Sequence, residues 1–276
     1  MRILIAVDGS PHAEAALRFS TQLVRRANEA PTILVVIRRR VRRLANQADA
    51  ILSCAQEILQ STVPEVQTKV RIGHAAEQIV LEASEGRYDL VVVGEKPVHS
   101  QAVRLRPGPT TTRVAEHAPC PVLIAKGRFE VIRRILLCDS GFRGPSVLSR
   151  FITQLADVLG GEEEVTVLHV MSQMSAGPGV EGRQLSATAA ELIAERAPEG
   201  VMLEADLQVL ERPDIHPRPK IRHGLVVDEI LAEAQAGDYD LVVIGAHQSQ
   251  GWQGILLDNM AHKIVTALDR PVLVVR

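Results

Sequence analysis

Two glycine-bearing loops are the parts of this sequence whose residues could hold a charged ligand. Each loop follows an apolar segment that occurs twice, as YDLVVVG at 88–94 and as YDLVVIG at 239–245. Glycines allow the backbone to approach an anion, and the free N–H groups at the start of a following helix hold phosphate oxygens. The loops at 94–112 and 245–259 are therefore the first candidates for a binding site.

The first loop, GEKPVHSQAVRLRPGPTTT, has features that favour an anion and features that oppose it. Its cations are Lys96, Arg104 and Arg106. Glu95 opposes an anion by its negative charge, and Pro97 and Pro109 each lack the N–H that would meet a phosphate. We expect a damaged site that is less hostile to phosphate than the second loop.

The second loop, GAHQSQGWQGILLDN, ends in Asp258 and Asn259. Aspartate is a good helix N-cap, so its carboxylate would take the free N–H groups and place a negative charge where phosphates would sit. Repulsion at close range and partial burial is worth about 1–4 kcal/mol per phosphate charge. This loop is therefore predicted not to bind a triphosphate.

The two loops lie in a sequence that is itself duplicated. The front segment RILIAVDGS at 2–10 returns as RILLCDSG at 134–141, and the end segment PVLIAK at 121–126 returns as PVLVVR at 271–276. Between these segments, residues of the first half recur at an offset of 151: Arg71, Gly73, Ile79, Glu82, Ala83 and Gly86. Matches that keep one order, with small changes of offset, indicate duplication with insertions.

The pattern of apolar runs predicts the fold of each copy. Short runs such as ILIAV, TILVVI and LVVVG are apolar throughout, as strands buried on both faces are, and they alternate with amphipathic stretches. The first predicted helix begins at Ser10-Pro11. This alternation requires βαβ crossovers and a parallel sheet. We predict two tandem α/β domains, 1–127 (copy one) and 128–276 (copy two), each a doubly wound, five-stranded parallel sheet.

Copy two is longer than copy one between its second and third strands. The extra residues lie near 198–220 and include ERPDIHPRPK, which holds three prolines. Because proline clusters mark turns and loops, we expect an excursion of the loop before the third strand.

The composition is that of an ordinary globular chain, and it limits the kinds of partner to be expected. Of 276 residues, 46% are hydrophobic and 23% are charged, and the net charge is −2. This balance gives no general attraction to nucleic acid or to an anionic membrane, so neither is an expected partner. No apolar run approaches the ~20 residues that span a bilayer. The three scattered cysteines suit a reducing compartment, and we expect a cytoplasmic protein.

Other chemistry-bearing residues have simpler explanations. The basic run RRRVRR at 38–43 is typical of a solvated surface, with phosphate or nucleic acid binding as the alternative. The nine histidines show no metal-ligand spacing, so no metal is expected. Cys120 precedes the last strand of copy one without an implied cation beside it, which favours packing over reactivity. No nucleophile and base can be assembled, and we expect no enzymatic activity.

Three segments together resemble the universal stress protein family in its tandem, two-domain form. They are ILIAVDGSPHAEAAL at 3–17, the pair YDLVVVG and YDLVVIG, and AEHAPCPVLIAK at 115–126. The resemblance covers essentially the whole chain. It implies a Rossmann-like fold of the adenine nucleotide alpha hydrolase-like type. In nucleotide-binding members, the loop after the fourth strand reads Gly-x-x-Gly, nine residues, then Gly-Ser/Thr.

The resemblance assigns candidate adenine-nucleotide contacts at the carboxyl ends of the strands. In copy one these are Asp8, Gly94, Lys96, Gly108 and Thr110. In copy two they are Asp139, Gly245 and His247. Asp139 lies one residue closer to the start of its segment, RILLCDSG, than Asp8 does in RILIAVDGS. Both loops depart from the family motif, since Pro97 and Gln248 replace its second glycine.

We therefore expect a non-enzymatic, tandem universal stress protein that acts as a regulatory or interaction module with degenerate nucleotide sites. The alternative is an ATP- or AMP-binding stress sensor that uses copy one; no other cofactor is expected. The resemblance also implies that the last strands, 121–125 and 271–275, pair as an internal pseudo-dimer. A protein partner is expected, and the sequence does not name it.

Overall fold

The computed structural model describes residues 1–39, 41–95, 108–127, 131–139, 147–172, 186–245 and 259–275. The strands of copy one are β1 (Ile3–Val7), β2 (Thr32–Ile37), β3 (Gln67–Ile72), β4 (Leu90–Gly94) and β5 (Val122–Ala125). Its helices are α1 (Pro11–Val24), α2 (Arg42–Gln60), α3 (Ala75–Glu85) and α4 (Pro109–His117).

Copy two repeats this alternation with one additional helix. Its strands are β6 (Arg134–Asp139), β7 (Glu163–Met171), β8 (Ile215–His223), β9 (Leu241–Gly245) and β10 (Val272–Val275). Its helices are α5 (Val147–Leu159), α6 (Ala189–Ala194), α7 (Pro198–Leu210), α8 (Val226–Ala236) and α9 (Asn259–Ala267).

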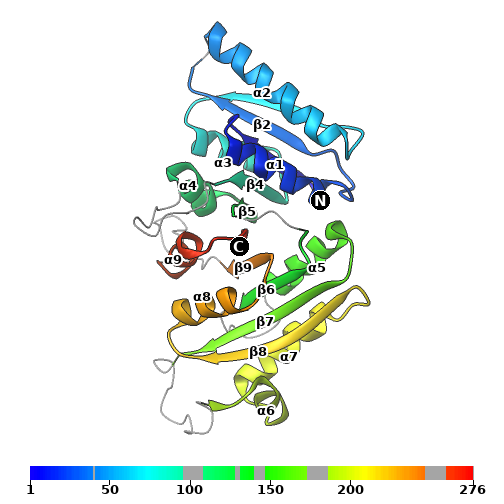
Figure 1. Cartoon of the computed structure of the whole chain (residues 1–276), viewed down its shortest axis with the longest axis vertical. Helices are drawn as coiled ribbons and strands as arrows, with labels where there is room; N and C mark the ends of the chain where they lie inside the picture. The colour runs from blue at the N-terminus through cyan, green and yellow to red at the C-terminus, as the bar shows by residue number, and fades with distance from the viewer. Residues whose placement is uncertain are drawn as a thin grey trace.

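The strands of both copies form one ten-stranded sheet in the order β3-β2-β1-β4-β5-β10-β9-β6-β7-β8. Neighbours within each copy are parallel, which confirms the two doubly wound domains. The copies meet at β5 and β10, which pair antiparallel with Leu123 opposite Leu273. Figure 1 shows the resulting elongated molecule, with α2 at one end, α6 at the other and the C-terminus near the middle.

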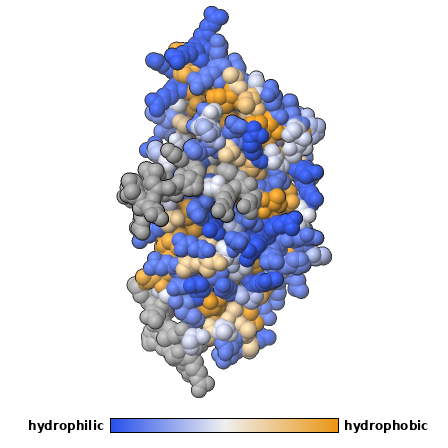
Figure 2. Space-filling model, in the orientation of Figure 1, coloured by the Kyte–Doolittle hydropathy of each residue, from blue (hydrophilic) through white to orange (hydrophobic). Residues whose placement is uncertain are grey.

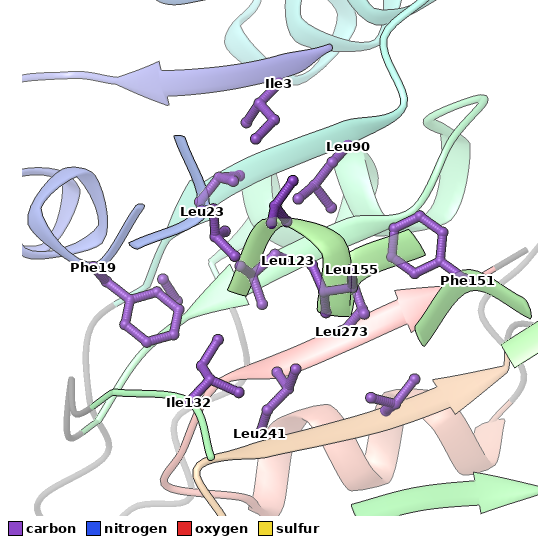
Figure 3. Close-up of a cluster of buried hydrophobic side chains, with 14 of the residues drawn as sticks. Ile3, Phe19, Leu23, Leu90, Leu123, Ile132, Phe151, Leu155, Leu241 and Leu273 are labelled. Carbon is purple, nitrogen blue, oxygen red and sulfur yellow. The ribbon is translucent and has the colours of Figure 1, made fainter. Parts of the chain in front are cut away.

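Helices cover both faces of the sheet, and each face has one core that runs through both copies. One core receives side chains from α1, α2, α5, α6 and α7, and the other from α3, α4, α8 and α9. α1 and α5 contact each other across the junction between the copies. Figure 3 shows side chains of both helices gathered near the two central strands: Phe19, Leu23, Phe151, Leu155, Leu123 and Leu273. The apolar surface buried there holds the copies together.

The prediction that the proline-rich segment near 198–220 forms a loop is wrong. β8 begins at Ile215 and contains Pro217 and Pro219, and α7 occupies much of the remaining range. The extra length of copy two forms α6 and α7, where copy one has α2 alone. Proline is tolerated in β8 because this strand lies at the sheet edge, where a missing N–H removes no bond to a neighbour. The domain boundary near 127 stays a prediction.

Candidate functional site

The carboxyl ends of β1 and β4 lie side by side, and Asp8 follows the first of them. The two strands are parallel neighbours, with Ala6 opposite Val93. Asp8 is exposed, and its Oδ1 accepts a hydrogen bond of 2.9 Å from the Ser10 N–H. Ser10 is in turn the N-cap of α1, because its Oγ accepts a hydrogen bond of 3.2 Å from the Ala13 N–H. Asp8 therefore stabilises the turn into α1.

Gly94 ends β4, and packing against α1 explains why it is glycine. A Cβ atom at this position would lie 2.6 Å from the carbonyl oxygen of His12. Any side chain would push the start of α1 away from the sheet. The fold therefore requires Gly94, whatever the loop after it binds.

The N-terminus of α4 is the place where copy one could bind an anion, and a side chain of the protein already occupies it. α4 begins at Pro109, with Gly108 as its N-cap. The Gly108 N–H donates a hydrogen bond of 3.0 Å to Oε1 of Glu95, whose side chain is buried. Thr110, in the first turn, is exposed. A carboxylate thus lies at the positive end of the helix, where a phosphate oxygen would otherwise be held.

Near Glu95, a buried lysine of copy one bonds to copy two. The Glu95 N–H donates to the carbonyl of Ala125, and Lys126 comes next along the chain. Lys126 is only 2% exposed, and its Nζ donates to the carbonyl of Val265 in α9. Burial raises the pKa of Glu95, and the charge of Lys126 opposes this shift. Burial lowers the pKa of Lys126, opposed by Glu95 and Asp269. Lys126 therefore fastens the end of copy one to the last turn of α9, and its charge lies close enough to Glu95 to influence that carboxyl group.

A cavity of about 280 Å³ opens beside the start of α4. It is lined by Val36 and Arg38 at the end of β2, by His74 before α3, and by Thr110 and Arg113 of α4. Two helix N-termini and two arginines make this cavity attractive to anions. Sequence reasoning found Thr110 and noted the basic run that begins at Arg38. It missed His74 and Arg113, because only the packing of α3 against α4 brings them to the loop.

The structure places Asp139 of copy two differently from Asp8 of copy one. The strand register aligns Ile135 with Ile3, since each pairs with the repeated leucine of its copy. Counting forward from this pair, Asp139 matches Val7 and is the last residue of β6. It is buried and lies within the sheet, so it does not stand in the turn that follows the strand.

Gly245 ends β9, but it is not held as tightly as its counterpart in copy one. A Cβ atom at position 245 would meet the nearest atom, in Leu148, at an ordinary 3.7 Å. The fold therefore does not require glycine here as it does at Gly94. Seven residues named from the sequence lie outside the part of the chain that the structure describes: Lys96, Pro97, Arg104, Arg106, His247, Gln248 and Asp258.

Four of the residues repeated at an offset of 151 form a polar cluster away from this edge, once in each copy. In copy one the buried carboxylate of Glu82 accepts hydrogen bonds from three side chains: Lys69 Nζ at 2.5 Å, Arg71 Nε at 2.6 Å and the Tyr88 hydroxyl at 3.1 Å. In copy two Glu233 has the matching partners: Lys220, Arg222 and Tyr239. Burial would raise the pKa of each glutamate, but these hydrogen bonds outweigh it and hold the pKa below its ordinary value. Each cluster fastens a helix, α3 or α8, to an edge strand.

Among the residues with described positions, no helix is long and apolar enough to cross a membrane. The same residues contain no group of three or more His, Cys, Asp or Glu side chains arranged to hold a metal ion. The three cysteines are thiols that form no disulfide.

The fold and the duplicated sheet edge define a tandem, Rossmann-like α/β protein. The universal stress protein family model matches residues 1–126 and again residues 132–276, so the chain belongs to the universal stress protein family. A universal stress protein of Mycolicibacterium smegmatis is 25% identical to it, over 99% of this chain and 96% of that protein.

Solved structures show the same architecture. A universal stress protein of Archaeoglobus fulgidus has a TM-score of 0.65 at 16% identity, over 100% of this chain and 98% of that one. A functionally unknown protein of Pseudomonas aeruginosa has a TM-score of 0.67 at 20% identity, over 99% and 92%. At these identities the likeness establishes the shared fold.

Proposed function

We propose that this chain is a regulatory or interaction module of the stress response, without enzymatic activity, in which neither copy holds a triphosphate. The observation that carries the proposal is the Glu95 carboxylate at the start of α4. A phosphate at this helix end would have to displace a buried carboxylate or lie beside it. Repulsion between two negative charges in partial burial is worth about 1–4 kcal/mol. The protein's own side chain takes the place of a ligand.

The polar groups near this edge are engaged in holding the fold. Asp8 stabilises the turn into α1, Glu95 caps α4, and Lys126 binds the end of α9. In the described part of the chain, none of them stands as a base beside a nucleophile, which supports a non-enzymatic role. The three thiols suit a reducing compartment, and we place the protein in the cytoplasm.

One observation favours a second candidate, an ATP- or AMP-binding stress sensor that uses copy one. The cavity beside α4 lies at the carboxyl ends of parallel strands, where open α/β sheets bind ligands. Arg38 and Arg113 line it and would attract phosphate without displacing Glu95 from the helix cap. In that arrangement side chains, rather than the N–H groups of α4, would hold the phosphates.

Two measurements separate these candidates. Native mass spectrometry of freshly purified protein detects any nucleotide that co-purifies, and calorimetry with AMP, or with ATP and magnesium, measures binding directly. Our proposal expects no bound nucleotide, no heat of binding and no release of phosphate from ATP. Micromolar binding by the wild-type chain would overturn it in favour of the sensor.

Two variants locate the ligand if binding is observed. A Cβ atom at position 108 meets nothing within 4 Å, so Gly108→Asp should fold normally while adding a negative charge at the start of α4. Loss of binding in Gly108→Asp places the phosphates at this helix end. Loss in Arg113→Ala, with binding retained in Gly108→Asp, places them in the cavity.

A third variant tests the role of Glu95 itself. Glu95→Ala removes the carboxylate and leaves the Gly108 N–H without its acceptor. If the carboxylate is what excludes phosphate, this variant should bind ATP more tightly than the wild type. Equal affinities would show that Glu95 does not block the site.

A further inference from the structure

The two ends of the ten-stranded sheet, β3 and β8, differ in whether they can accept another strand. In a parallel sheet, alternate residues direct both backbone groups to one neighbour. In β3 the Gln67 N–H donates to Pro31 and the Gly73 N–H, just past the strand, donates to Ile37. The odd-numbered residues therefore bond to β2. The even-numbered residues, Thr68, Val70 and Ile72, direct their N–H and C=O groups outward, toward the open edge.

The β8 edge is blocked. The N–H of Gly224, just past this strand, donates to the carbonyl of Met171, so the even-numbered residues bond to β7 and the odd-numbered ones face outward. Pro217 and Pro219 are odd-numbered and lack the N–H that an added strand would need. α6 and α7 also pack against β8. Prolines and covering helices are common protections of a sheet edge.

The β3 edge has neither protection. At an offset of 151, Thr68 stands where β8 has Pro219, so an N–H is present at the matched position. α2 packs over β2, and beyond it Val70 and Ile72 of β3 are 42% and 45% exposed. Figure 2 shows orange, hydrophobic patches among polar ones at the end of the molecule that holds α2. An unpaired strand with exposed apolar side chains is a template for another strand.

We propose that β3 pairs with β3 of a second copy of this chain, antiparallel, about a twofold axis through Val70. The β5–β10 junction already joins two of these modules by antiparallel pairing of edge strands, with the helices of each face kept on the same side. Pairing at β3 repeats that geometry. Val70 lies opposite Val70 of the partner subunit, and Thr68 lies opposite Ile72 of the partner subunit. All three residues exchange their outward backbone hydrogen bonds.

The side chains of β3 suit this pairing on both faces. On the face toward α2, the apolar side chains of Val70 and Ile72 meet their symmetry mates between the two α2 helices and are removed from water. On the other face, Lys69 lies opposite Arg71 of the partner subunit. Each of these cations already bonds to Glu82 of its own chain, so the cluster is compensated and like-charge repulsion across the axis is reduced. The interface is small, which predicts a weak dimer with micromolar affinity.

Sedimentation velocity over a range of concentrations tests the proposal with three variants of the full chain. Thr68→Pro gives β3 the residue that β8 carries and removes only an outward N–H. Val70→Lys places two ammonium groups opposite each other at the axis. Val131→Lys, at a valine that is 65% exposed outside the strand, is the matched control. We expect concentration-dependent dimers for the wild type and Val131→Lys, and affinity weakened by roughly tenfold or more for the other two.

Cross-linking tests the register. Val70→Cys, in a Cys54→Ser background that removes the exposed native thiol, places two sulfurs across the axis. Directly opposed residues in a hydrogen-bonded antiparallel pair have Cα atoms about 5.5 Å apart, within reach of a disulfide. Oxidation should give a covalent dimer with Val70→Cys and none with Thr68→Cys alone. Circular dichroism confirms that each variant is folded.

Three outcomes would overturn the proposal. The wild type could sediment as a monomer at every concentration, which would leave the β3 edge without a second copy. It could dimerise with an affinity that Thr68→Pro and Val70→Lys leave unchanged, which would place the interface elsewhere. Folded Val70→Cys could also fail to cross-link while the wild type dimerises, which would rule out the axis at Val70.

Discussion

The buried glutamates Glu82 and Glu233 have the same three kinds of partner in the two copies. In both, two cations and a tyrosine hydroxyl bond to the buried glutamate. In both, an arginine lies over the tyrosine ring, 5.4 Å from its centroid in copy one (Arg2) and 5.8 Å in copy two (Arg134). The carboxyl ends of the strands share far less.

The glycines of the repeat belong to the same clusters. A Cβ atom at Gly86 would lie 2.1 Å from the ring of Tyr88, and one at Gly237 would lie 2.2 Å from the ring of Tyr239. Both tyrosines are buried and donate hydrogen bonds to their glutamates, so neither ring can move aside without weakening that bond. The repeated glycine, tyrosine and glutamate residues therefore form a packing unit that holds α3, or α8 in copy two, on its sheet.

At the carboxyl ends of the strands, the two copies carry different types of residue. Copy one has Val7 and Val35 there, beside a mostly apolar cavity of about 260 Å³ between α1 and α2. The register of copy two puts Asp139 and His169 at the matching positions of β6 and β7. The copies therefore differ in chemistry at this edge, whereas the glutamate clusters keep the same three partners.

The largest expected effect comes from neutralising either glutamate. Glu82→Gln keeps the shape of the side chain but leaves Lys69 and Arg71 without their counter-charge. We expect a loss of about 2–3 kcal/mol in the free energy of unfolding, below the full cost of breaking a buried pair because both cations reach water. Glu233→Gln should cost a similar amount. Urea denaturation of both variants measures this.

The pH dependence of these variants is a second readout of the same clusters. Because the pKa of Glu82 and of Glu233 is held below the ordinary 4.5, their stabilisation is complete above pH 4.5 and is lost progressively as the pH falls from there through the lowered pKa of the folded chain. The variants should lose part of this acid sensitivity. A wild-type stability that stays constant to pH values well below 4.5 would contradict the assignment.

Substitution of the two repeated glycines should have the next largest effect. Gly86→Ala and Gly237→Ala each insert a methyl group against a tyrosine ring that its glutamate holds in place. Overpacking of this kind costs about 1–3 kcal/mol, and the two costs should agree if the clusters are equivalent. Gly108→Ala is the control, since its Cβ meets open space. Thermal unfolding of the three variants gives the comparison.

The smallest effect concerns His169, which sharpens the contrast between the carboxyl ends. Burial lowers its pKa below 6.5, opposed by a hydrogen bond to the backbone of Asp139 and by the charge of Glu199. The folded chain therefore binds fewer protons than the unfolded chain, and stability is lost as the pH falls below about 6.5. His169→Val installs the residue of copy one and should flatten that part of the curve. Denaturation midpoints on both sides of this pH test it, and an unchanged slope would show that His169 is not responsible.

Much of the fold was readable from the residues. Runs such as TILVVI and LVVVG became β2 and β4, and the end segments 121–125 and 271–275 contain the strands β5 and β10 that pair. Of the candidate site residues, Gly94 and Gly108 are placed where the pattern put them, at the end of β4 and the start of α4. The loop predicted near 198–220 is wrong because two of its prolines lie in β8, and only the strand order shows that β8 is an edge strand.

The duplication and the alternation of strands and helices in copy one could be predicted from the sequence alone, because they depend on local periodicity and residue type. The tertiary structure decided which groups meet. Glu95 and Gly108 are 13 residues apart and bond only because β4 and α4 place them together. The choice between a blocked and an open edge likewise follows from strand order and backbone direction. Neither property belongs to any short stretch of residues, since each arises only when distant segments pack.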